Sequence, residues 1–259
     1  MPVQLIGLPF DGKSSYMKGS ALAPNRIREE LRSDAYNPYA ESMRNVLSDD
    51  ALTDEGNIEA AAFADVFEEI SEIMTAEHKP LFLGGDHSLA YQAVKACHEM
   101  FGPFHILQFD AHNDLYPDFD GDIYSHACPF ARILDEGLAL SLTQVGIRAS
   151  TPVQREQIMK YGVKEYSMRK VNEFDPASLQ GPLYISLDMD AFDPGFAPGV
   201  SHHESGGLSP RQFLNWLGQI DVPIIGADLV EFNPLMDVKG LTAALCAKMV
   251  KELIDALMK

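Results

Sequence analysis

The chain has 259 residues, of which 46% are hydrophobic, and this is enough to bury one large core in a single α/β domain spanning residues 1–259. Its formal net charge of −18 argues against a nucleic-acid or anionic-membrane partner, because such binding depends on neutralisation of phosphates by Lys and Arg. A small neutral or cationic substrate suits this charge better, although an acidic surface can also serve solubility alone.

The sequence contains no stretch that approaches the roughly 18 apolar residues of a membrane span, and no basic region with a long apolar run follows Met1. Its three cysteines, Cys97, Cys128 and Cys246, share no CxxC spacing, which argues against a disulfide framework or a thiolate zinc site. We therefore expect a cytoplasmic protein with reduced thiols.

Short apolar runs predict strands, and segments whose apolar residues are spaced by three and four predict amphipathic helices. In chain order these patterns give a strand at 3–10, a helix at 57–77, a strand at 80–85, a helix at 88–101, strands at 104–109, 141–147 and 183–190, a helix at 209–220, a strand at 223–232 and a helix at 242–258. This alternation is typical of a three-layer α/β sandwich with a mainly parallel sheet and helices on both faces.

Polar motifs follow four of these strands. They are GGDHS at 84–88, DAHND at 110–114, DMDAFDP at 188–194 and VEFNP at 230–234. The carboxyl ends of parallel strands meet at one edge of a sheet, which is where α/β folds bind their ligands. We therefore expect the four motifs to form one site.

Two of the motifs carry metal-ligand side chains at a spacing of two. Asp110, His112 and Asp114 follow one apolar run, and Asp188 and Asp190 repeat the spacing after another. Alternate residues of an extended segment share a face. Because a bare cluster of carboxylates and imidazoles carries like charge and a large desolvation cost, a cation is expected among them. The pattern therefore indicates a metal site.

His87 follows a Gly-Gly turn at the same predicted edge and brings the set to four carboxylates and two imidazoles. One of its neighbours, Asp86 or Ser88, is interpreted as the cap of the next helix. The oxygen-rich set suits manganese, and zinc, iron and nickel are compatible with it. Two divalent ions would balance the four Asp charges. Two metals about 3.5–4 Å apart can share a water, lower its pKa and make hydroxide available at neutral pH.

The four motifs, together with IGLPFDGKSSYMKGSALAPNRIREEL at 6–31, resemble the signature motifs of the arginase and agmatinase (ureohydrolase) family, and the match covers most of the chain. The resemblance implies an arginase-like fold and a hydrolase with two Mn²⁺ per chain that releases urea and an amine from a small cationic guanidino substrate. Agmatine or a close relative is the substrate we expect. A homo-oligomer, either a trimer or a hexamer, would fit the family.

The resemblance also assigns roles to single residues. His87, Asp110, Asp114 and Asp188 would hold one ion, and His112, Asp110, Asp188 and Asp190 would hold the other, with Asp110 and Asp188 bridging. Hydroxide would attack the guanidinium carbon, and Asp114 would orient it and accept its proton. Glu231 would bind the guanidinium group through its carboxylate, and His126 would relay a proton to the leaving amine.

Three acidic residues, Asp118, Asp120 and Asp122, lie between the last DAHND ligand and His126. If any of them faces the pocket, it would favour a substrate that has a cationic amine and no carboxylate, which describes agmatine and excludes arginine. The alternative is a solvated loop. We therefore predict that this loop contributes to substrate binding.

Several alternatives stay open. Formiminoglutamate, or another guanidino acid, would need a cationic anchor, for which Arg148 in QVGIRAS is a candidate. A catalytically silent binding or scaffold protein of the same fold would be marked by loss of ligands, and all six are present. Within 197–208, His202, His203 and Glu204 either line the pocket mouth or are solvated. Asp193 is interpreted as shaping a turn.

Overall fold

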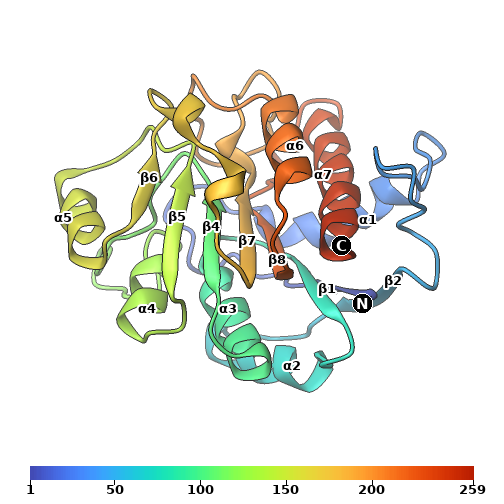
Figure 1. Ribbon diagram of the computed structural model, residues 1–259, viewed down its shortest axis with the longest axis horizontal. Coiled ribbons are helices and arrows are strands. Elements are labelled where there is room, and N and C mark those ends of the chain that lie inside the picture. Colours follow the sequence, from blue (N-terminus) through green and yellow to red (C-terminus); the bar gives the residue numbers. More distant parts are fainter.

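The computed structural model describes residues 1–259 and contains one eight-stranded sheet in the order β2-β1-β3-β8-β7-β4-β5-β6 (Figure 1). Every neighbouring pair of strands is parallel. The strands are β1 (Val3–Gly7), β2 (Leu52–Asn57), β3 (Lys79–Leu83), β4 (His105–Phe109), β5 (Ser141–Val145), β6 (Lys164–Tyr166), β7 (Leu183–Asp188) and β8 (Ile224–Val230). The helices are α1 (Ala23–Leu31), α2 (Val66–Ile73), α3 (Leu89–Phe101), α4 (Pro129–Asp135), α5 (Pro152–Tyr161), α6 (Pro210–Gln219) and α7 (Leu241–Leu257).

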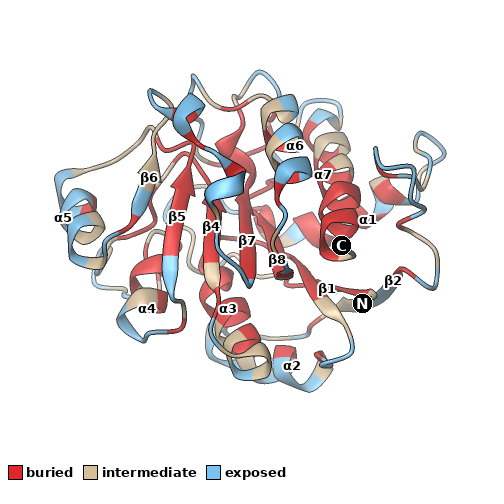
Figure 2. Cartoon of the chain, viewed as in Figure 1, coloured by how far each residue is buried: buried red, intermediate tan, exposed pale blue.

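Helices cover both faces of the sheet. Buried residues of α1, α6 and α7 share one hydrophobic cluster with one face, and those of α2, α3 and α4 share a second cluster with the other. Alternate residues of a strand divide between the clusters: Leu81 and Leu83 belong to the first, and Phe82 belongs to the second. Figure 2 shows the central strands buried between these layers. The predicted three-layer α/β fold is confirmed.

The structure also contains elements that the apolar patterns did not predict. β2 and β6 are the two edge strands, and their side chains are mostly polar and are exposed or only partly buried. An edge strand needs no apolar run, which explains why they were missed. The predicted helix 57–77 is shortened to α2, because Asn57 ends β2. Helix α5 was missed because Gln154 is its only buried residue, so it has no apolar stripe.

The four motif-bearing strands are neighbours in the sheet. β3, β8, β7 and β4 lie side by side in that order, and their last residues are in register: Leu83 pairs with Leu229, which pairs with Leu187, which pairs with Phe109. The residues that follow these strands therefore emerge at the same level of one sheet edge. This register brings the four polar motifs together.

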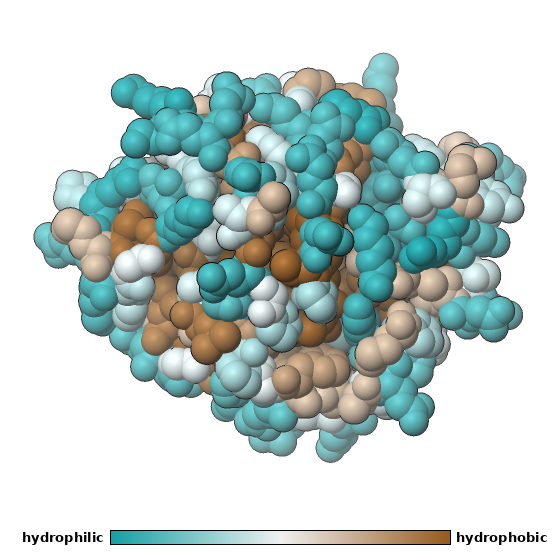
Figure 3. Space-filling view, in the orientation of Figure 1, coloured by the Kyte–Doolittle hydropathy of each residue, from teal (hydrophilic) through white to brown (hydrophobic).

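No helix of the chain has both the length and the apolar character that a membrane crossing requires. Hydrophilic side chains cover much of the molecular face drawn in Figure 3, and hydrophobic ones gather toward its middle. The three cysteines are buried and free, as expected for thiols without a disulfide.

Candidate active site

A cavity of about 350 Å³ opens at the carboxyl ends of the central strands. Its lining includes six of the residues that the sequence selected, namely His112, Asp114, His126, Asp188, Asp190 and Glu231. His87 and Asp110 are completely buried beside it. The structure thus assembles, in and around one pocket, all of the predicted metal ligands and both of the predicted catalytic residues outside the metal set.

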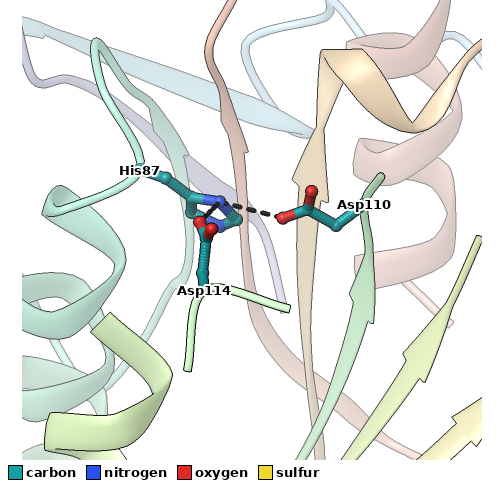
Figure 4. A group of neighbouring side chains, drawn as sticks. All are labelled: His87, Asp110 and Asp114. Carbon is teal, nitrogen blue, oxygen red and sulfur yellow. Dashed lines mark ion pairs between the residues drawn. The ribbon is translucent and has the colours of Figure 1, made fainter. Parts of the chain in front are cut away.

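His87 lies at the centre of a ring of carboxylates. Its Nδ1 atom lies 2.9 Å from Asp114, 3.1 Å from Asp188 and 3.2 Å from Asp110. Figure 4 shows the imidazole facing the carboxylates of Asp110 and Asp114, which come from the turn after β4. The Nδ1 atom is buried and has no hydrogen-bond partner of proper geometry. Four potential ligand atoms therefore converge on one largely buried point at the base of the cavity.

The other ring nitrogen of His87 has a defined partner. Its Nε2 lies 2.9 Å from the hydroxyl of Ser186, and that hydroxyl donates a hydrogen bond of 2.7 Å to the carboxylate of Asp228. Because the single hydroxyl proton goes to Asp228, the oxygen of Ser186 accepts from Nε2–H. A neutral His87 in this arrangement directs its Nδ1 lone pair at the three carboxylates, which is the orientation of a metal ligand.

The electrostatics of His87 and its three carboxylates favour a bound cation. Burial alone would lower the pKa of His87, but the close carboxylates of Asp110, Asp114 and Asp188 raise it well above the ordinary value. Burial raises the pKa of Asp188 well above its usual range, and the nearby charges of Asp190 and Asp110 add to this effect. A positive charge is therefore strongly favoured here, and a divalent ion would supply it without requiring that the carboxylates take up protons.

His112 forms a second group of ligands with Asp110 and Asp190. Its Nδ1 lies 2.9 Å from Asp190 and 3.6 Å from Asp110. Burial lowers the pKa of His112, but the charge of Asp190 and the hydrogen bond to Asp110 dominate and raise it to about 12. The Oδ1 of Asp110 faces His112 and its Oδ2 faces His87. This division of its two oxygens suits a carboxylate that bridges two ions.

The carboxylates themselves are held in place by hydrogen bonds. Asp110 accepts from the side chain of Gln108 at 2.6 Å, Asp188 accepts from the backbone of Asp190 at 2.7 Å, and Asp190 accepts from the backbone of Ala111 at 3.0 Å. These contacts link the turn after β4 to the turn after β7. With two imidazole nitrogens and four carboxylates in place, the residues fit a pair of divalent ions, and their oxygen-rich character suits manganese.

Glu231 and His126 form a pair on the wall of the pocket. The Oε1 of Glu231 accepts hydrogen bonds from the backbone N–H of His87 at 2.9 Å and from Nδ1 of His126 at 3.1 Å, whereas its Oε2 has no protein donor. Burial opposes ionisation of Glu231, but the bond from His126 lowers its pKa overall. Burial lowers the pKa of His126, and Glu231 outweighs this and raises it to about 9. His126 therefore carries a proton at neutral pH, and Glu231 is ionised.

Two pocket residues have unusual backbone conformations. Asp114 has φ of 50° and Glu231 has φ of 61°, in the left-handed region that residues with a side chain rarely occupy. Each is held there by neighbouring backbone, and the N–H of Glu231 donates to the carbonyl of Gly85 at 2.8 Å. Such strain is typical of functional sites, because it fixes the direction of a side chain that packing alone would not select.

The structure contradicts the sequence-based prediction for the acidic loop. Asp118, Asp120 and Asp122 do not line the pocket. Asp118 accepts from the backbone of Gly121 at 2.9 Å, and Asp122 forms an ion pair of 2.6 Å with Lys13. The prediction that this loop binds substrate is therefore wrong: none of the three lines the pocket, and the carboxylates of Asp118 and Asp122 are engaged by a loop-closing turn and by a basic side chain of the N-terminal segment.

Arg148 is not a substrate anchor either. Its guanidinium donates to the backbone carbonyls of Gly146, Asp190, Ala191, Phe192 and Glu204 at 2.6–3.4 Å.

Asp193 closes a turn by accepting from three backbone N–H groups, as predicted. Ser88 is the N-cap of α3, although its side chain makes no cap bond, and the carboxylate of Asp86 accepts from the backbone N–H groups of Ser88 at 3.1 Å and of Lys13 at 2.9 Å.

Sequence reasoning missed several residues of the pocket wall. Ser15, Tyr116, Phe119, Ser150, Thr151 and Gln154 line it, and the hydroxyl of Ser15 lies 2.9 Å from Nε2 of His126. These residue types follow no recognisable sequence pattern, so only their positions after the strands could have indicated that they line the pocket. His202 and Glu204 also line the pocket, whereas His203 lies outside it and contacts the carbonyl of Pro198 at 2.8 Å.

The chain is similar to known proteins over nearly its whole length. Residues 1–255 match the Arginase family. The mitochondrial arginase of Medicago truncatula is 41% identical over 98% of this chain and 82% of its own length, and the agmatinase of Bacillus cereus is 30% identical over 97% and 90%. The solved structure of the Medicago truncatula arginase superposes with a TM-score of 0.91 at 40% identity, covering 99% of this chain and 87% of the other.

Proposed function

We propose that this chain, which belongs to the arginase family of hydrolases acting on guanidino C–N bonds, hydrolyses L-arginine to urea and ornithine. The observation that carries the proposal is the free Oε2 of Glu231 in the same pocket as the two ligand groups around His87 and His112. A guanidinium group is a planar cation with parallel N–H donors, and an ionised carboxylate beside a metal centre is its natural acceptor.

The residues that would hold the two metals are His87, Asp110, Asp114 and Asp188 for one ion, and Asp110, His112, Asp188 and Asp190 for the other. Manganese is the metal we propose. Two such ions, when bound by these residues, would supply a water of lowered pKa as nucleophile and would stabilise negative charge on the reacting atoms.

Three protein side chains provide the remaining catalytic functions. Glu231 orients the guanidinium carbon toward the metal centre. Asp114 lines the pocket and has its carboxylate 2.9 Å from His87, so it is placed to orient the nucleophile and to accept its proton. His126 carries a proton at neutral pH and lies at hydrogen-bond distance from Glu231 and Ser15, so it can protonate the leaving amine.

The choice of arginine replaces the preference for agmatine that the acidic loop suggested, because that loop lies outside the pocket. The relatives at 41% identity are named arginases. Residues with hydroxyl groups also line the pocket, among them Ser15 and Tyr116, and a hydroxyl can donate to a substrate carboxylate. Agmatine is the second candidate, because no Lys or Arg lines the pocket. The same absence disfavours formiminoglutamate, which has two carboxylates.

The test is a urea-release assay over arginine, agmatine, 4-guanidinobutyrate and 3-guanidinopropionate, with formamide and ammonia release from formiminoglutamate measured in parallel. Protein stripped by a chelator should be inactive, and manganese should restore activity. We expect arginine to give the highest kcat/KM. A triple variant, Asp118→Asn with Asp120→Asn and Asp122→Asn, should keep the wild-type ratio of arginine to agmatine. Higher efficiency with agmatine would assign the second candidate, and no urea from any compound would refute the proposal.

A further inference from the structure

One acidic residue of the pocket differs from the others. Five carboxylates line the cavity, those of Asp114, Asp188, Asp190, Glu204 and Glu231. Four of them contact His87, His112 or His126 at 2.9–3.1 Å and belong to the metal centre or the catalytic pair. The carboxylate of Glu204 makes no hydrogen bond or ion pair within the chain, although its residue is half-buried. The metal centre and the catalytic pair leave the carboxylate of Glu204 without a function.

The backbone around Glu204 is firmly placed. Its carbonyl oxygen accepts from Nε of Arg148 at 3.0 Å and from Nη2 at 2.6 Å, and the same Nη2 donates to the carbonyl of Asp190 at 2.7 Å. Two residues further, the N–H of Gly206 donates to Asp193 at 2.7 Å. Arg148 therefore ties the segment that carries Glu204 to the turn that carries a metal ligand, which sets the position of one relative to the other.

The segment also packs against the catalytic pair. The ring of His202 lies 5.3 Å from that of His126 and 5.6 Å from that of Tyr16, measured between centroids. Glu204 follows two residues later and lines the same cavity. Glu204 and Glu231 therefore line one cavity, in which Glu231 is proposed to hold the reacting end of the substrate.

From this arrangement we propose that Glu204 determines specificity by accepting the ammonium group at the end of the substrate opposite its guanidino group. The inference rests on the proposed function, and it holds for arginine and agmatine alike, because agmatine is arginine without its carboxylate and carries its amine on the same carbon. An ammonium has three donors and no acceptor, so an unpaired carboxylate is its complement. Arg148 is a positioning residue in this scheme, since it acts only through the backbone of Glu204.

The experiment compares Glu204→Gln with wild-type protein on arginine, agmatine and 5-guanidinopentanoate, the last being arginine without its amine. A matched control is Glu156→Gln, because Glu156 is an exposed glutamate of α5 outside the cavity lining and its substitution changes the net charge equally. We expect Glu204→Gln to raise KM for arginine and agmatine about five- to tenfold with kcat within about twofold, since the lost contact is a partly exposed charge pair. The KM for 5-guanidinopentanoate should not change.

Equal effects on all three compounds would overturn the proposal, because they would indicate a structural role, and so would unchanged KM values for the two amines. Calorimetric binding of the same compounds gives the same ratios without turnover. If the wild-type protein releases no urea, the proposed function fails, and the binding ratio between arginine and 5-guanidinopentanoate still decides whether Glu204 recognises an ammonium group.

Discussion

Ser186→Ala offers a sharp test of how the metal centre is organised, because it removes one hydroxyl and leaves every predicted ligand in place. Ser186 is completely buried, accepts from Nε2 of His87 and donates to Asp228. Without it, the Nε2–H of His87 loses its acceptor in a dry environment, which costs about 1–3 kcal/mol. The ring also loses the contact that directs its Nδ1 lone pair at the metal position.

Loss of a hydrogen-bond partner behind a ligating histidine typically weakens metal binding about 10- to 100-fold, or about 1.4–2.7 kcal/mol. We expect an effect of this size on manganese affinity, measured by titration calorimetry against a competing chelator. Ser20→Ala is the matched control, since Ser20 is equally buried but its hydroxyl has no hydrogen-bond partner. Unchanged manganese affinity in a folded Ser186→Ala variant would refute the assigned orientation of His87.

Three further predictions follow from the same site. Asp188→Ala and Asp110→Ala should each lose more bound manganese than variants of the other four ligands, because these two residues are proposed to contact both ions; metal analysis that finds one ion fully retained in Asp188→Ala would contradict the bridging role. Glu231→Gln keeps the shape but removes the charge, so kcat/KM should fall at least tenfold, about 1.4 kcal/mol or more, with metal content unchanged. Metal binding should release protons and strengthen from pH 6 to pH 9, because the raised pKa values of His87 and His112 mean that both carry protons in the metal-free protein and must lose them to bind. Titrations in two buffers of different ionisation enthalpy would count those protons, and a count of zero would be incompatible with the assignment.

The sequence by itself was sufficient for the parts that depend on local pattern. Period-two spacing of Asp110, His112 and Asp114 at the end of an apolar run, repeated at Asp188 and Asp190, indicated a metal site before any fold was known. The structure brings these side chains together in and beside one cavity, because their strands are adjacent and in register. Apolar periodicity likewise predicted the buried strands and the amphipathic helices, since burial is what creates that periodicity.

Only the tertiary structure decided which polar side chains face the pocket. Asp120 and Glu204 both lie in polar loops and carry similar charge, yet one is outside the cavity and the other lines it. Arg148 has the residue type of a carboxylate anchor, but its donors are taken up by backbone carbonyls from the turn after β7. Loop side chains acquire their direction from contacts with segments far away in the chain, such as Lys13 with Asp122. No local spacing encodes those contacts, so the pocket wall, unlike the metal ligands, had to be read from the fold.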